Sequence, residues 1–119
     1  MKMKLFDSEL KVMDVLWKEG DQPAKNLAAT LGEQVGWNKN TTYTVIKKCI
    51  EKGAIARREP NFVCHAQITR EAAQAQEVDE LIDKLFDGSA DMLFASLLDR
   101  KQLPDGMAER LRRLIEEGE

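Results

Sequence analysis

The sequence predicts a mainly α-helical protein with one small β-hairpin, divided into two parts near residue 70. Apolar residues recur at helical spacing through most of the 119 residues, and only the stretch after Gly53 changes to the alternation that is typical of strands. The charge also changes along the chain. Residues 1–70 carry 12 Lys and Arg against 8 Asp and Glu, whereas residues 71–119 carry 6 against 13. A basic part joined to an acidic part indicates a different partner for each.

Composition limits the class of protein. A hydrophobic content of 43% is sufficient for a real core, and two cysteines are too few for a disulfide framework. The first residues lack the apolar run of a signal peptide, and no stretch has the length of a membrane span. We therefore expect a soluble, cytoplasmic protein that does not insert into a membrane.

Two helices are expected before residue 37. Asp7 suits the N-cap of the first, which runs through Lys18 and is followed by Gly20. Pro23 suits the start of the second, because a missing amide costs nothing in the first helical turn, and Gly36 ends it. The apolar residues of each helix form one stripe, namely Leu10, Met13, Leu16 and Trp17 in the first, and Ala24, Leu27, Ala28, Leu31 and Val35 in the second.

The third helix, within residues 37–53, is the best defined. Asn38 is a good N-cap and Gly53 suits a left-handed residue just past the end. One face of this helix is apolar and consists of Thr42, Val45, Ile46, Cys49 and Ile50. The opposite face is rich in Asn, Thr and Lys, which can donate hydrogen bonds to phosphates and base edges. A solvated surface helix is the alternative interpretation of this face.

A β-hairpin should follow, with strands over residues 54–59 and 62–68 and with Pro60 and Asn61 in the turn. We expect Cys64, Ala66 and Ile68 to face inward, and Val63, His65 and Gln67 to face outward. Three helices followed by a hairpin with a basic tip predict a winged helix-turn-helix over residues 1–70. In that arrangement the third helix enters the major groove, and the wing touches the DNA backbone or the minor groove.

This interpretation defines a candidate DNA-binding surface on the third helix and on the wing. The residues expected to contact DNA are Asn38, Lys39, Asn40, Thr41, Tyr43, Thr44, Lys47 and Lys48 on the helix, and Arg57 and Arg58 on the wing. Trp37 either wedges the turn before the helix or reaches the DNA backbone. We favour the structural role for Trp37.

Residues 71–119 are expected to form a helical dimerisation region. Three short amphipathic helices are indicated, the last opening at Pro104, and so small a unit cannot bury all their apolar faces by itself. A second copy of the chain would cover them, although they could instead fold back on residues 1–70. The expected interface consists of Val78, Leu81, Ile82, Leu85, Phe86, Leu93, Leu97, Leu111, Leu114 and Ile115.

No residue pattern indicates catalysis or a bound metal. The chain has one His and two Cys, and the adjacent Cys64 and His65 would point to opposite faces of a strand. Cys49 lies on the apolar face of its helix. We therefore expect Cys49 and Cys64 to be small buried apolar side chains. Nucleophile elbows, phosphate-binding Gly loops and zinc-protease motifs do not occur. We therefore expect a protein that is not an enzyme and that needs no cofactor.

Three segments resemble the penicillinase and methicillin-resistance repressor family, of the BlaI/MecI type. They are Leu5 to Trp17, then Trp37 with Thr41, Thr44 and Lys48, and finally Lys52 and Gly53 before the wing. The resemblance implies an N-terminal winged helix and a small helical dimerisation region. It further implies a dimeric transcriptional repressor of a palindromic operator in double-stranded DNA. The regulated genes would serve β-lactam resistance or cell-envelope stress.

Two departures from the family pattern bear on the inducing signal. Copper-responsive members end in a cluster of cysteines, and this chain has none after Cys64. Antibiotic-responsive members are cleaved at an Asn-Phe bond, which corresponds here to Ser96-Leu97. We expect relief of repression by proteolysis near that bond, through a membrane sensor protease system. The alternatives are a metal- or redox-responsive repressor that uses Cys49 or Cys64, and a winged-helix module that binds proteins instead of DNA.

Overall fold

The computed structural model describes residues 3–99, together with residues 106, 109 and 113. It separates the chain into two compact units, Met1–Gln76 and Glu77–Glu119. Three residues expected at a dimer interface, Leu111, Leu114 and Ile115, lie outside the described residues, as does the expected helix start at Pro104.

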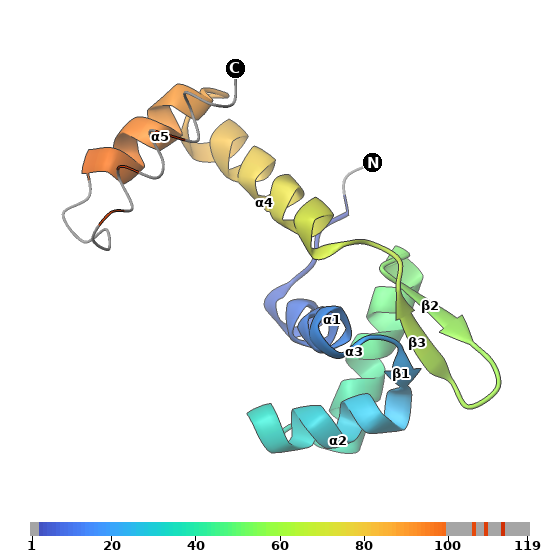
Figure 1. Cartoon of the computed structure of the whole chain (residues 1–119). Helices are drawn as coiled ribbons and strands as arrows, with labels where there is room; N and C mark the ends of the chain where they lie inside the picture. Colours follow the sequence, from blue (N-terminus) through green and yellow to red (C-terminus); the bar gives the residue numbers. More distant parts are fainter. Residues whose placement is uncertain (1–2, 100–105, 107–108, 110–112, 114–119) are drawn as a thin grey trace. The chain divides into compact units, whose positions relative to one another are not determined.

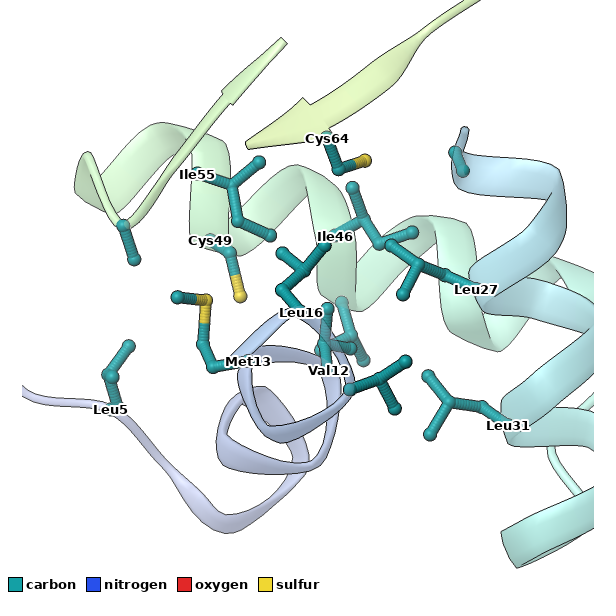
Figure 2. Packing of buried hydrophobic residues seen from close by; sticks show 14 of the residues in the cluster. Leu5, Val12, Met13, Leu16, Leu27, Leu31, Ile46, Cys49, Ile55 and Cys64 are labelled. Carbon is teal, nitrogen blue, oxygen red and sulfur yellow. The ribbon is translucent and has the colours of Figure 1, made fainter. Parts of the chain in front are cut away.

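The first unit is built on α1 (Asp7–Glu19), α2 (Ala24–Val35) and α3 (Lys39–Lys52) (Figure 1). Their apolar stripes face one another, as the spacing predicts. The shared core includes Val12, Met13, Leu16, Leu27, Leu31, Ile46 and Cys49, each at most 3% exposed, and Figure 2 shows these side chains converging from the helices. Burial of this apolar surface holds α3 in place and leaves its polar face free.

The start of α1 differs from the prediction. Asp7 is the first residue of the helix, and Phe6 occupies the N-cap position with extended backbone angles, φ −81° and ψ 166°. The prediction that Asp7 caps the helix is therefore wrong. The Phe6 side chain makes no cap hydrogen bond, but Oε1 of Glu9, in the first turn, accepts a hydrogen bond of 2.7 Å from the Phe6 amide. This is the carboxylate half of a capping box.

Both ends of α3 are as predicted. The side chain of Asn38 accepts a hydrogen bond of 2.8 Å from the amide of Thr41, which satisfies one of the free amides of the first turn. Gly53 has a left-handed φ of 83°, and its amide donates to the carbonyls of Cys49 and Ile50. The limits of α3 are therefore set by local hydrogen bonds at both ends.

The predicted hairpin is present, and it belongs to a larger sheet. β2 (Ile55–Arg58) and β3 (Val63–Ala66) pair antiparallel, and β1 (Gln22–Pro23), which was not predicted, pairs with the other side of β3. The order is β1-β3-β2. The strands are shorter than expected, and residues 59–62, instead of Pro60 and Asn61 alone, make the connection.

The predicted alternation along β3 agrees with the burial of Cys64, the packing of Ala66 and Ile68 against the core, and the exposure of Gln67. Cys64 is fully buried against the helices, as expected. Ala66 and Ile68 are half-buried and pack against the core. Val63 and His65, which were expected to face outward, are half-buried. His65 lies against Asp21, with Nδ1 2.9 Å from Oδ1 of that carboxylate.

Two further helices follow, α4 (Arg70–Leu85) and α5 (Ala90–Asp99). The start of α4 is fixed to the first unit, because Arg70 lies 3.0 Å from a carboxylate oxygen of Asp14 and Ala73 is buried. The Trp17 indole also donates to the carbonyl of Ile68 over 2.9 Å. No residue of α5 is buried. Within the described residues, no helix is both long and apolar enough to cross a membrane.

Candidate nucleic-acid interface

The polar face of α3 is accessible along its length. Of the eight DNA contacts predicted on α3 and its N-cap, seven are exposed, namely Asn38, Lys39, Asn40, Thr41, Thr44, Lys47 and Lys48. Tyr43 is half-buried. The buried side of the same helix carries Thr42, Val45, Ile46 and Cys49. α3 is thus buried on one face and exposed on the other. The buried face holds the helix in place, and the exposed face is accessible to a partner.

Part of this face forms the floor of an open hollow of about 490 Å³. Five predicted contacts line it together: Asn38, Asn40, Thr41, Thr44 and Lys48. Lys39, Tyr43, Lys47 and the wing arginines do not line it. Ser8, in the first turn of α1, Trp37 and Val45 also line the hollow. Ser8 was missed by the sequence reasoning, which treated α1 as a core helix and gave its polar residues no role.

Hydrogen bonds within α3 determine what its polar side chains can offer. The Thr44 hydroxyl donates to the carbonyl of Asn40 over 2.9 Å, so Thr44 presents a methyl group and acceptor lone pairs outward. The side-chain ammonium groups of Lys47 and Lys48 make no hydrogen bond or ion pair with any part of the chain that the structure describes. Both ammonium groups are therefore available to neutralise an anion such as a phosphate.

The two arginines of the wing are each paired with a carboxylate. Nε of Arg57 donates to Oε2 of Glu59, and the guanidinium stacks 3.7 Å from the centroid of the Phe62 ring. The hydrogen bond from Arg57 lowers the pKa of Glu59, and the amide of Phe62 adds a second, smaller contribution. The Glu59 carboxylate is therefore ionised over the physiological range and fixes one edge of the guanidinium.

Arg58 has a looser partner on the other side of the sheet. Its terminal nitrogen lies 3.5 Å from Oδ2 of Asp21, and Nδ1 of His65 lies 2.9 Å from Oδ1 of the same carboxylate. The pair is exposed, so water weakens the attraction. The structure thus places Arg57 and Arg58 on β2 as predicted and gives each an intramolecular counter-charge that sequence spacing did not indicate.

Aromatic contacts connect the wing with the beginning of α3. The rings of Tyr43 and Phe62 meet edge to face, with centroids 6.0 Å apart, and the ammonium of Lys39 lies 5.8 Å from the Tyr43 ring. Together with Arg57 on Phe62, these contacts form a continuous series from Lys39 to Arg57. The only signal that marks Phe62 in the sequence is a large apolar side chain beside a turn.

The thiols and the histidine are not brought together as a metal site. Among the described residues, no group of three or more His, Cys, Asp or Glu side chains could hold a metal ion. Burial raises the pKa of Cys49 to about 12 and that of Cys64 to about 11. Both thiols are therefore protonated and weakly reactive at neutral pH.

A helix with a free polar face, held on a helical core and flanked by a basic hairpin, defines a winged helix-turn-helix protein of the DNA-binding class. The sequence matches the model of the penicillinase repressor family over residues 5–117. The chain belongs to this family, which is a family of transcriptional repressors and not of enzymes.

The chain is also similar to individual proteins. The chain is 22% identical over 116 residues to the penicillinase repressor of Bacillus licheniformis, covering 96% of this chain and 91% of that protein. It is also similar to the solution structure of the DNA-binding domain of the repressor BlaI, with 28% identity and a TM-score of 0.54 over 59% of this chain and 90% of that one. A MarR family regulator from Neisseria meningitidis matches with 24% identity and a TM-score of 0.41, covering 97% and 82% of the two chains.

Proposed function

We propose that this repressor is a homodimer that binds a palindromic operator in double-stranded DNA. Residues 1–70 read the DNA and residues 71–119 form the dimerisation region. The observation that carries the proposal is the hollow on α3, where Asn38, Asn40, Thr41, Thr44 and Lys48 converge on one accessible surface. Lys48 suits a phosphate, whereas the short side chain of Thr44 suits a base edge. Arg57 and Arg58 supply the wing contact.

Exposed apolar side chains in the second unit support dimerisation. Val78, Leu81 and Leu85 of α4 are 45%, 38% and 67% exposed, and Met92 of α5 is 53% exposed. They belong to, or adjoin, the stripe that the sequence predicts for an interface. Covering these side chains with the same face of a second copy removes apolar surface from water and sets two reading helices on one operator. The affinity of one half-site then adds to that of the other.

We also propose that repression is relieved through a change in the second unit. Ser96 and Leu97 lie in the middle of α5, where no side chain is buried. A helix without buried anchors opens locally at low cost, and the opened segment fits the extended binding site of a protease. We propose cleavage near this bond, driven by a membrane sensor protease system, with genes of β-lactam resistance or cell-envelope stress as the targets.

Binding of the full chain to DNA tests the proposal. Binding sites are selected from a pool of randomised DNA duplexes. The affinity for the enriched site is then measured by fluorescence anisotropy at several salt concentrations. We expect enrichment of a palindrome and an affinity that falls steeply with salt, because bound lysines and arginines release counterions from DNA. A chain without salt-dependent DNA affinity would instead be a module that binds protein partners.

Cleavage has its own test. Cells are treated with a cell-wall antibiotic, and the repressor is followed by mass spectrometry while transcription of its target genes is measured. The expected product is an N-terminal fragment that ends near residue 96 and contains the intact winged helix. A repressor that stays full-length while its targets are transcribed would rule out proteolytic relief.

A further inference from the structure

We infer that Phe62 is a positioning residue that holds the wing in register with the reading helix and aims Arg57 at the DNA backbone. The inference rests on the proposed function, since it assumes that α3 and the wing bind one duplex. It concerns how the two contacts are coupled. Phe62 does not itself touch DNA in this account; it acts through Arg57 and Tyr43.

The backbone of Phe62 is fastened on both sides. Its amide donates to Oε1 of Glu59 over 3.3 Å, and its carbonyl accepts from the amide of Ala24 over 2.9 Å. The first bond closes the connection between β2 and β3, and the second ties that connection to the first residue of α2. Phe62 also has a left-handed φ of 51°, a backbone conformation that residues other than glycine rarely adopt. The loop therefore fixes where the ring stands.

The ring of Phe62 has a neighbour from each half of the reading surface. Tyr43 of α3 meets it at an interplanar angle of 72°, an arrangement that places the positive edge of one ring near the negative face of the other. The guanidinium of Arg57 lies over the ring, where the same quadrupole attracts a cation. A displacement of Phe62 would therefore shift the wing arginine relative to α3.

The Arg57 side chain remains 49% exposed, so an anion can reach it. Glu59 engages Nε, and the Phe62 ring covers one face of the guanidinium. The two terminal nitrogens have no partner among the described residues. Their parallel N–H groups match the geometry of two phosphate oxygens. Holding the guanidinium in advance means that less side-chain freedom is lost when DNA binds.

A double-mutant cycle on operator affinity tests this coupling. The variants are Arg57→Gln, Phe62→Leu and both together, measured with the full chain across a salt series. In the wild-type background, Arg57→Gln should lower the affinity about tenfold and reduce the salt slope by about one. In the Phe62→Leu background, the same substitution should lower the affinity no more than about threefold. Without the ring, the Arg57 guanidinium is no longer held in the position that contacts the DNA backbone.

Lys48→Gln provides the matched control for general loosening of the fold. Lys48 lies on α3, away from the Phe62 ring, so its effect on affinity and salt slope should be the same in both backgrounds. Phe62→Tyr keeps the ring and should restore the full effect of Arg57→Gln. If Phe62→Leu does not fold, Phe62→Gly replaces it, because glycine accepts the left-handed backbone and lacks the ring.

The outcomes separate the inference from the proposed function. An undiminished effect of Arg57→Gln in the Phe62→Leu or Phe62→Gly background overturns the positioning role, and operator binding is untouched by that result. Equal losses of the Arg57 and Lys48 effects would also overturn it, since Phe62 would then only stabilise the fold. A wild-type chain that does not bind operator DNA refutes the proposed function, and the inference falls with it.

Discussion

The carboxylate of Glu9 and the ammonium of Lys52 meet at 2.6 Å and join the first turn of α1 to the last turn of α3. Glu9 is only 1% exposed, and its second oxygen has no hydrogen-bond partner in the part of the chain that is described. Lys52 also donates to the carbonyl of Lys4 over 2.7 Å and lies 4.2 Å from the Phe6 ring. The N-terminal segment is thus fastened directly to the end of the reading helix.

Removing the ammonium should be costly. Lys52→Met leaves a buried carboxylate without a counter-charge and should lower the free energy of unfolding by about 3 kcal/mol, measured by urea denaturation. Adding Glu9→Gln should recover part of that loss, because the buried charge is then gone. Lys47→Met, on the exposed face of the same helix, is the control and should change stability little. A Lys52→Met protein as stable as wild type would contradict this account.

The cap of α3 gives a second prediction, on stability alone. Asn38→Ala removes the acceptor for the Thr41 amide and should cost about 1 kcal/mol in thermal or urea unfolding. Asn38→Asp should retain most of the stability, since a carboxylate is an equally good cap. Asn40→Ala is the matched control, and an equal loss there would show that capping is not the cause.

Thr44 should affect which bases are preferred. Because its hydroxyl hydrogen is committed to Asn40, Thr44 can accept a hydrogen bond from a base or pack its methyl group against thymine. Thr44→Ser removes the methyl and Thr44→Val removes the acceptor, so the two variants should relax different base preferences in a selection from randomised half-sites. A uniform loss of affinity over all sites would mean that Thr44 only positions the helix.

The proposed dimer should dissociate when a charge is placed in the apolar stripe of the second unit. Leu85 is 67% exposed in the single chain, so Leu85→Asp should leave the first unit folded. In a dimer interface the same carboxylate would be desolvated, and sedimentation should show a monomer with strongly reduced operator affinity. Lys84→Gln, off the stripe, should stay dimeric. An unchanged Leu85→Asp dimer would place the interface elsewhere.

The buried thiols predict a specific pH dependence. Burial raises the pKa of Cys49 from an ordinary value of 9.0 to about 12, so the folded state favours the neutral thiol. The corresponding stability is present below pH 9 and is lost as the pH rises from there toward 12. At pH 8, iodoacetamide should label Cys49 and Cys64 only after denaturant is added, as read by mass spectrometry. Rapid labelling of the native protein would instead favour a redox-responsive repressor.

Local rules explain why most of the fold could be predicted. Apolar spacing located α1, α2 and α3, and Asn38 and Gly53 marked the ends of α3 by hydrogen bonds formed within a few residues. The cap of α1 was wrong because residue preference favoured Asp7, whereas the longer side chain of Glu9 reaches back to the amide of Phe6.

The features that were missed depend on partners far away in the sequence. A strand as short as Gln22–Pro23 has no periodicity, and it is defined only by its pairing with β3. The ring of Phe62 likewise contacts Tyr43 and Arg57 only in the folded chain. The pattern of polar and apolar residues did predict which face of α3 is exposed, because that pattern lies within one helix. The arrangement of wing against helix needed the tertiary structure.

The pairing of Gln22 with Cys64 also sets an order of events during synthesis. The segment between these residues contains all of α2 and α3, so the sheet cannot close until both helices and most of the wing have emerged from the ribosome. Local helical contacts form quickly, whereas closing a long loop carries an entropic cost that must be met first. All of α3 therefore leaves the ribosome before the hairpin is complete, and a chain released before residue 66 contains α3 but lacks a full β3.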